Sequence, residues 1–375
     1  MALHPALAAT KGHSAAEVRE TFVRARALAE QIDRPEYLVR LAVSQWGVHL
    51  GRSEHKLALS LAEQVEGIGE VRNDASAQLQ GRRMHGLIRC YLGQFVAARA
   101  LLERCFGLSD PAHRAVRGGL SGDPYALMLA YLAVTLAHLG YIDQARSRLE
   151  EALSEARRLK HAVTLAGVLN FASWMDSITH SPELQRHAEE LLVLSTEHGF
   201  PFFLNRAIAS RGRSLSVLGQ VEKGLALLTQ GLVADRATGT VVQTPRLLMS
   251  LAEAYAMLGQ PVEGLNCLLE AAQIIETTEE RVAEAELHRL QGDLLNATGD
   301  RSAAEGNYRQ ALVVAKRQSA KLFELRSATS LARLWRDQGK IADAQALLAP
   351  IYAWFAEGFD APDLVEAKAL LHELA

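Results

Sequence analysis

Residues 212–231 read GRSLSVLGQVEKGLALLTQG. An apolar segment leads to Gly219, a small residue follows five positions later at Gly224, and another follows at Gly231. A further small residue, Gly212, stands seven positions before Gly219. A glycine ends a helix well, because it tolerates the left-handed backbone conformation that the turn needs. Small side chains spaced along one helix face let a second helix cross closely. The stretch therefore predicts two antiparallel helices in close contact.

This pattern recurs along the chain at a regular interval. Glycines 219, 259, 299 and 339 are 40 residues apart, and two earlier copies stand at 93 and 140. The small residues seven positions before these turns are Gly86, Ala133, Gly212, Ala252, Gly292 and Ala332. Fixed repeats of this length are typical of stacked helix pairs, in which each pair packs on its neighbours. We therefore predict an all-α, tetratricopeptide-like (TPR-like) right-handed superhelical solenoid of antiparallel helix pairs with a period of about 40 residues.

Composition agrees with this fold and limits the partners. Of the 375 residues, 49% are hydrophobic but only 6% are aromatic, so alanine and leucine, which are strong helix formers, dominate. The formal charge of −3 argues against a dedicated nucleic-acid binder. No apolar run is long enough to cross a membrane, and the first residues lack the features of a secretory signal. With only three cysteines, we expect a cytoplasmic protein.

Local signals divide the chain. We expect an N-terminal tail over 1–13, a repeat array over 14–359 and a capping helix over 360–375. Within the array, a capping box at Ser14 predicts a helix over 14–32, and a pair is expected over 37–50 and 54–66. One degenerate repeat should have its first helix over 163–178 and its second from Ser181. The Gly-rich stretch 107–123 is predicted to be a long loop with a function or mobility of its own.

The first helix of each pair should line the concave groove of the solenoid. The small contact residue fixes the helical phase, so positions six before, three before, one after and four after it should face the groove. Arginine dominates these positions, and its guanidinium suits carboxylates and phosphates. We expect an acidic peptide or protein segment in the groove; alternatively the arginines are solvated or pair with neighbouring carboxylates. The inward set is Arg83, Arg206, Arg213, Arg246, Glu253, Glu286, Arg289, Asp293, Asn296, Arg326, Arg333 and Arg336.

A second candidate is a small-molecule pocket in the degenerate repeat, where Asn170, Trp174 and Asp176 combine aromatic and polar groups. Its occupant would be a small-molecule effector. An enzyme built on the repeat scaffold is a third hypothesis, which the loop 107–123 and the histidines leave open.

Catalytic and metal signatures are missing from the sequence. There is no Gly-x-x-x-x-Gly-Lys-Ser/Thr loop and no zinc-binding pattern, and Gly119–Gly122 has the wrong spacing for a nucleophile elbow. Glu284 and His288 are expected to lie on a solvated helix face, and Cys90 and Cys105 to be buried free thiols. We therefore predict a protein that is no enzyme and needs no cofactor or metal.

Several stretches resemble a known family. They are 91–99 (YLGQFVAAR), 139–145 (LGYIDQA), 197–201 (EHGFP), 285–293 (AELHRLQGD), 330–339 (SLARLWRDQG) and 354–368 (WFAEGFDAPDLVEAK). The chain resembles the C-terminal TPR-like repeat region of bacterial multidomain predicted ATPases and adenylate/guanylate cyclase-associated regulators of the maltose-activator type. The ATPase and cyclase portions have no counterpart here, so their activities cannot be assigned to any residue. The resemblance implies a protein-interaction and regulatory scaffold of a signal-transduction ATPase or cyclase system.

Overall fold

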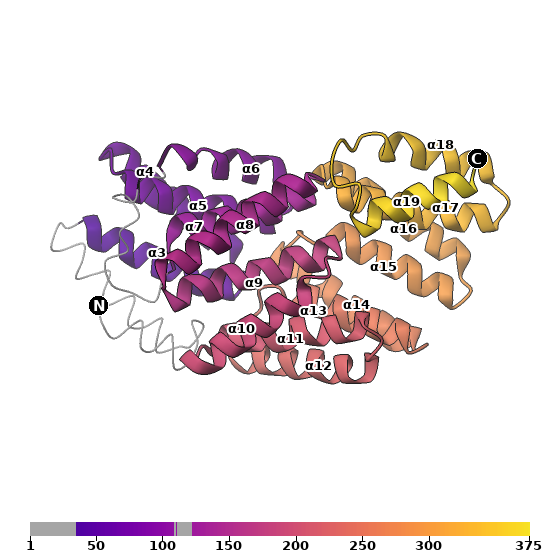
Figure 1. Cartoon of the computed structure of the whole chain (residues 1–375), viewed down its shortest axis with the longest axis horizontal. Helices are drawn as coiled ribbons and strands as arrows, with labels where there is room; N and C mark the ends of the chain where they lie inside the picture. The colour runs from indigo at the N-terminus through magenta and orange to yellow at the C-terminus, as the bar shows by residue number, and fades with distance from the viewer. Residues whose placement is uncertain (1–34, 109, 111–121) are drawn as a thin grey trace.

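The computed structural model describes residues 35–108, 110 and 122–375, and Figure 1 shows its course. These residues form α-helices and one short 3₁₀ turn over Phe106–Leu108, and no strand occurs among them. The helices are α3 (Pro35–Gly51), α4 (His55–Val71), α5 (Ala75–Tyr91), α6 (Phe95–Glu103), α7 (Pro124–His138), α8 (Ile142–Leu159), α9 (Ala162–Thr179), α10 (Leu184–His198), α11 (Pro201–Val217), α12 (Val221–Ala237), α13 (Thr244–Met257), α14 (Pro261–Thr278), α15 (Glu284–Ala297), α16 (Arg301–Gln318), α17 (Lys321–Asp337), α18 (Ile341–Tyr352) and α19 (Pro362–Glu373).

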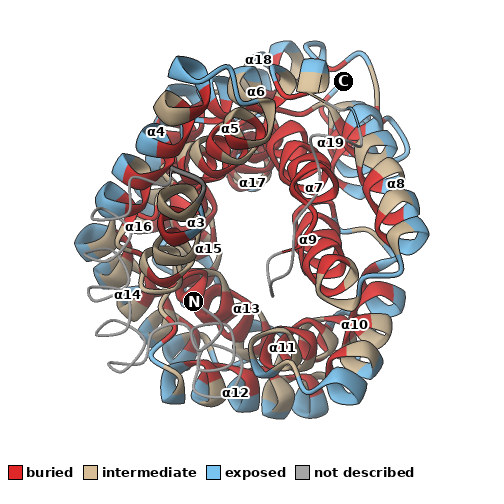
Figure 2. Cartoon of the chain, turned by 90° about the vertical axis from the view of Figure 1, so that its left-hand side faces the viewer, coloured by how far each residue is buried: buried red, intermediate tan, exposed pale blue. Residues whose placement is uncertain are grey.

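Consecutive helices pack as pairs, from α3 with α4 to α17 with α18, and α19 covers the last pair. Figure 2 shows the odd-numbered helices from α3 to α17 on the inside of a ring and their even-numbered partners outside. Burial follows this arrangement, since α8 buries one stripe that includes Ala145, Leu149 and Ala152, whereas all of α7 is buried. The predicted TPR-like solenoid of helix pairs is confirmed.

The turn glycines have the predicted role. Gly93, Gly140, Gly219, Gly259, Gly299 and Gly339 each follow the first helix of a pair, with φ between 69° and 92°. At Gly219 the backbone N–H donates to the Ser216 carbonyl at 3.0 Å, which closes the last turn of α11. A side chain is strained at such φ values, so glycine at these positions has a direct physical cause.

Close helix crossing is confirmed at the small residues of the repeat. A Cβ atom added to Gly212 would lie 2.8 Å from the Gly224 carbonyl oxygen, and one added to Gly224 would lie 2.6 Å from the Gly212 carbonyl oxygen. One added to Gly231 would lie 2.9 Å from the Ala209 Cβ atom. The backbones of α11 and α12 thus touch at positions that larger side chains would hold apart.

Helix boundaries differ from the predictions by a few residues. In the degenerate repeat α9 extends one residue further at each end than predicted, but α10 begins at Leu184 instead of Ser181. The Ser181 hydroxyl accepts the Glu183 N–H at 3.2 Å, which forms a turn before the helix starts. The predicted helix over 14–32, the tail and Gly119–Ser121 lie outside the described residues, and the division of the chain stays a prediction.

Turns from the two halves of the chain meet, which closes the superhelix. The Val241 N–H donates to the Gly51 carbonyl at 2.8 Å, and the Val282 N–H donates to the Tyr91 carbonyl at 3.0 Å. These partners are 190 and 191 residues apart in sequence, so one superhelical turn spans about five helix pairs. Further along, the Gly358 N–H donates to Asp143 Oδ2 at 2.9 Å. The second layer of pairs therefore sits on the first, and the inner helices of both layers face one interior.

The helices in the described ranges are too short or too polar to cross a bilayer.

Candidate functional site

A cavity lies inside the superhelix, between the inner helices. The cavity volume that a water-sized sphere can occupy is about 50 Å³, within a wider hollow of about 480 Å³ that includes open solvent. Residues of α7, α9, α11, α13, α15 and α17 line it, together with Val282 and Ala283 of the turn before α15. Side chains that are far apart in sequence therefore share one space.

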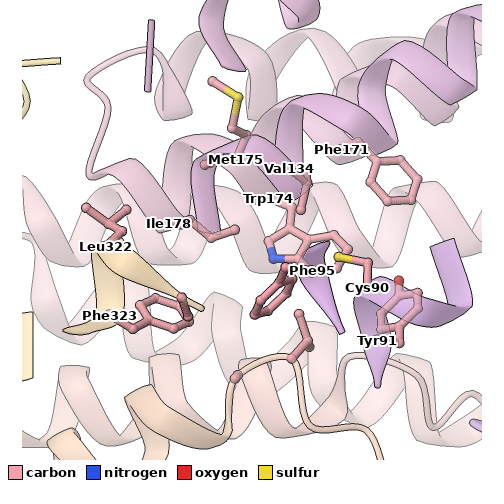
Figure 3. Packing of buried hydrophobic residues seen from close by; sticks show 14 of the residues in the cluster. Cys90, Tyr91, Phe95, Val134, Phe171, Trp174, Met175, Ile178, Leu322 and Phe323 are labelled. Atoms are coloured by element: carbon pink, nitrogen blue, oxygen red, sulfur yellow. The ribbon is translucent and has the colours of Figure 1, made fainter. Parts of the chain in front are cut away.

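Trp174 forms the apolar wall of this cavity. Its side chain is almost fully buried, with the ring centroid 5.3 Å from that of Tyr91 and 6.2 Å from that of His138. Figure 3 shows the indole between aromatic side chains that come from other helices, including Phe95 and Phe323. The apolar wall of the cavity is thus part of a cluster of packed aromatic rings.

The opposite wall carries charges at equivalent positions of the repeat. Arg213 and Glu253 each stand one residue after the small contact residue of their helix, and they form an ion pair across α11 and α13. Arg213 Nη1 also donates to the Ser250 hydroxyl at 3.1 Å. A partly buried pair of this kind satisfies both groups, which remain in the wall as a polar surface beside a ligand.

A second cluster of charges joins α15, α17 and α19. Arg326 makes a bidentate pair with Asp363, with two N–O distances of 2.8 Å, and lies 3.6 Å from Glu286. Arg289 Nη2 lies 2.7 Å from Glu286 Oε1. Burial alone would raise the pKa of Glu286, but these two guanidinium groups lower it to about 2. The cluster therefore remains charged and paired at neutral pH.

Arg246 differs from these arginines. Among the described residues no carboxylate lies within ion-pair distance of it, and its Nε is buried without a hydrogen-bond partner. Nη2 donates to Gln243 Oε1 at 3.0 Å, and the Cζ atom lies 5.7 Å from the Trp174 ring centroid. Burial, with the like charges of Arg206 and Arg213, lowers the pKa of Arg246 to about 9.

Two other predicted arginines are enclosed in the fold. Arg206 lies 3.1 Å from Asp235 and donates to the Val242 carbonyl. Arg83 donates to the Tyr131 hydroxyl at 3.0 Å and lies between the rings of Trp46 and Tyr131. Neither lines the cavity, so the structure gives both a packing role.

The remaining groove candidates lie away from the cavity. Asp293 pairs with Arg289 and accepts the Tyr308 hydroxyl at 2.8 Å, and Asn296 is exposed. Arg333 pairs with Glu366, and Arg336 pairs with Glu373. Apart from Arg246, the arginines predicted on α11, α13, α15 and α17 all have carboxylate partners, which agrees with the alternative in which these charges pair within the chain.

Of the predicted small-molecule trio, only Trp174 lines the cavity. Asp176 is buried against α10, with Oδ2 at 2.7 Å from His187 Nδ1, and burial raises its pKa. Asn170 is also buried and is not part of the lining. Trp174 and Asp176 are two residues apart and point to different sides of α9, whereas Asn170 is one turn before Trp174 on the same side but lies outside the lining. The binding role of the trio stays a prediction.

The lining also includes residues outside the predicted set. His138 lies on α7, which has no arginine among the predicted inward residues. Ser250 is next to the inward position 249, and Phe323 is three residues before Arg326 on α17. Met249 is three residues before Ala252 and obeys the same phase rule, so its position could have been found. Three of the predicted groove arginines, Arg213, Arg246 and Arg326, thus share one cavity with Trp174, which the sequence had placed in a separate candidate site.

Cys90 and Cys105 are free and buried, as predicted, and burial raises the pKa of each thiol to about 12. Such thiols are poor nucleophiles. Across the described ranges, no three His, Cys, Asp or Glu residues are grouped so as to hold a metal ion.

Known structures share the fold. No family model and no curated protein matches the chain. A Rap protein complexed with competence and sporulation factor aligns with a TM-score of 0.55 at 14% identity, over 90% of this chain and 97% of that one. The apo quorum sensor NprR from B. thuringiensis aligns at 0.51 and 11%, over 89% and 92%. The human IFIT1 dimer with m7Gppp-AAAA aligns at 0.51 and 14%, over 96% and 77%. At these identities the likeness establishes the TPR-like fold, and the resemblance to ATPase-associated repeat regions stays a prediction.

Proposed function

We propose that the chain is a sensing and interaction scaffold that binds a short ligand, a peptide or a small molecule, in the cavity between its two superhelical layers. One observation carries this proposal: the cavity is lined by six inner helices, with an aromatic wall on one side and charged side chains on the other. Enclosed sites with a mainly apolar lining and a few convergent polar groups are typical of ligand binding.

The closed superhelix favours a short ligand over a long acidic segment. A long segment would need an open groove with free arginines along it. Instead, turns of the two layers are hydrogen-bonded to each other, and most inward arginines are paired within the chain. We therefore prefer the sensing hypothesis to a partner that lies along the whole inner face.

The cavity is well placed to report on its occupant. Trp174 and His138 belong to the first layer, whereas Arg246, Glu286 and Arg326 belong to helices of the second half. A ligand that contacts both sides favours the closed arrangement, by as much as its affinity for that arrangement exceeds its affinity for others. A protein partner on another surface of the scaffold would bind the closed arrangement and the other arrangements with different affinities.

Two of the similar structures concern the binding of a factor or the sensing of a signal. One is a Rap protein in complex with a factor, and another is a quorum sensor. Those properties belong to these proteins, and they support a search for an effector here. The IFIT1 structure contains a capped RNA, so a capped oligonucleotide should be included in that search. The acidic net charge of this chain favours the peptide or small molecule.

The finer proposal is that the scaffold serves a signal-transduction ATPase or cyclase. It rests on the family resemblance of the sequence. An ATPase or cyclase encoded next to this chain in the genome would support it, and co-purification of the two products would test it directly.

A ligand screen tests the proposed function. Peptides, metabolites and a capped oligonucleotide are added to the folded chain, and the unfolding temperature is measured. A ligand that binds only the folded state raises this temperature. The double variant Arg213→Met, Glu253→Met removes one ion pair from the cavity wall without leaving a lone charge, and it should weaken the effect.

The matched control is Arg333→Met, Glu366→Met, which removes an ion pair outside the cavity. It should respond to the ligand like the unmodified chain. If no compound in any class raises the unfolding temperature, the proposal is wrong. It is also wrong if both double variants respond equally to the ligand.

A further inference from the structure

We propose that Arg246 binds the carboxylate of the ligand, and that the ligand is a monocarboxylate with an apolar body. This inference rests on the proposed function and names the chemical class of its ligand. The carboxylate could belong to the free C-terminus of a peptide or to a small organic acid, since both present the same group.

The unpaired state of Arg246 is the first argument. The other two arginines of the cavity, Arg213 and Arg326, each have carboxylate partners among the described residues, whereas Arg246 has none. A buried polar group without a partner is costly unless something satisfies it. A ligand carboxylate would supply the missing acceptor to a guanidinium that is already inside the cavity.

The position of Arg246 is fixed in advance. Gln243 is buried, and its Nε2 donates to the Tyr91 hydroxyl at 2.8 Å while its Oε1 accepts from Arg246 Nη2. The Gln243 N–H donates in turn to Glu280 at 2.9 Å. These bonds hold Nη2 of the guanidinium, and Nε is enclosed by the fold. Nη1, which has no partner among the described residues and is not enclosed, is the donor that a ligand can reach. Preorganised donors of this kind reduce the entropy lost on binding.

The surroundings of Arg246 suit an apolar body. Trp174 lies under the guanidinium, and Met249, Leu290 and Phe323 also line the cavity. Arginine and tryptophan together form a surface on which a carboxylate binds at one end and an aromatic or aliphatic group packs at the other.

The charge balance limits the ligand to one negative charge. Three arginines and two glutamates line the cavity, which leaves a net charge of +1 on those five groups. A second negative charge would find no unpaired cation in the cavity, because Arg213 and Arg326 are already paired with carboxylates of the chain. A phosphate or a polyanion would therefore bind less well than a monocarboxylate.

The experiment compares matched probes. 3-Phenylpropionate is compared with 3-phenylpropionamide, and a tripeptide Gly-Gly-Phe with its C-terminal amide, and inorganic phosphate serves as the other anion. Binding is measured by calorimetry and by the rise in unfolding temperature. Both carboxylates should bind at least about tenfold more tightly than their amides, because a hydrogen bond to a charged group is lost in the amides. The stronger of the two carboxylates identifies the source.

Two variants separate binding from structure. Arg246→Met should abolish the preference for carboxylate over amide, and Arg246→Lys should restore part of it, since a lysine retains the charge without the planar fork. Without ligand, Arg246→Met should have an unfolding temperature at or above that of the unmodified chain, because an uncompensated buried charge is removed. Arg213→Met should lower it, because Glu253 loses its partner.

The outcomes distinguish this inference from the proposed function. If amides bind as tightly as acids, or if phosphate binds more tightly, the carboxylate assignment is wrong while the sensing role remains. An unchanged preference for acids in Arg246→Met would also overturn it. If no probe of any kind binds, both proposals fail.

Discussion

The two walls of the cavity come from helices of opposite character. Every residue of α7 is buried, and α9 is buried from Ala166 to Thr179, because both pack between their own partners and the second layer. By contrast, α13 and α15 carry charged side chains at inward positions, such as Arg246, Glu253 and Glu286. The same repeat position is therefore apolar where the layers meet and charged where the interior stays open. Packing holds the first wall in place, and ion pairs hold the second.

The largest loss of stability is expected from a variant that disrupts the apolar wall. Trp174→Ala should lower the free energy of unfolding by up to about 5 kcal/mol, because it removes a large, fully buried side chain and leaves a cavity. Chemical denaturation of the two proteins would measure this loss. Trp335→Ala is the control, since Trp335 is only partly buried. Equal losses in the two variants would show that the first wall is not the more tightly packed region.

A slightly smaller effect is expected from the charged wall. Arg326→Met should cost about 3 kcal/mol, because it leaves the buried carboxylate of Asp363 without its bidentate partner. The double variant Arg326→Met, Asp363→Leu should regain much of this stability, which a double-mutant cycle would quantify. No recovery in the double variant would mean that Arg326 acts mainly through its bond to the Ile178 carbonyl.

Close packing within the helix pairs, which holds both walls in place, can be tested at a single glycine. Gly212→Ala should destabilise the chain by about 1–3 kcal/mol, because the new methyl group would meet the backbone of α12. Gly306→Ala is the matched change in α16, where an added Cβ atom would meet no atom outside its own helix backbone within 4 Å. It should stabilise the chain by about 0.5–1 kcal/mol. Thermal unfolding of both variants would show whether the signs differ, and two changes of the same sign would contradict close packing at Gly212.

The smallest effect concerns pH. Burial, and then the charge of Arg326, lowers the pKa of His138 from its usual 6.5 to about 4, although its bond to the Val134 carbonyl opposes this. Between these two pH values the unfolded chain binds a proton that the folded chain does not, so stability falls as the pH falls from 6.5 to 4. At pH 5.5 the loss from this group is about 1.4 kcal/mol.

The variant His138→Phe tests this assignment. It keeps the stack on Phe95, whose ring centroid is 4.4 Å from that of His138, and removes the titration. Its stability should change less between pH 6.5 and 4 than that of the unmodified chain. Glu286 and Asp363 have lowered pKa values in the folded chain, so their stabilisation is lost only as the pH falls towards the ordinary values of 4.5 and 3.8 that these carboxyls have when unfolded. Between pH 6.5 and about 5.5 the slope therefore reports on His138, and an unchanged slope there in His138→Phe would rule out this histidine as its source.

Much of the architecture could be predicted because its causes are local. A glycine at positive φ and a small residue at a helix crossing are requirements of one helix pair, and they recur at each copy of the repeat. The same periodicity gave the helical phase, so Arg213, Arg246, Glu253 and Glu286 were expected on the inner face, where the cavity lies. The binding role of these residues stays a prediction.

The pairing of the charges could not be read from the chain. Arg206 and Arg246 occupy equivalent positions in consecutive repeats, yet Arg206 lies against Asp235 while Arg246 faces Trp174. One part of this difference is local, because the position equivalent to Asp235 in the next repeat is Ile275, which cannot pair with an arginine. The other part, the position of Arg246 over Trp174, depends on the closing of the superhelix, in which turns about 190 residues apart come together after the accumulated rotation of five helix pairs. Local spacing thus fixes the helix pair and the side that faces inward, whereas the packing of one layer on the other determines which inward side chains meet in the cavity.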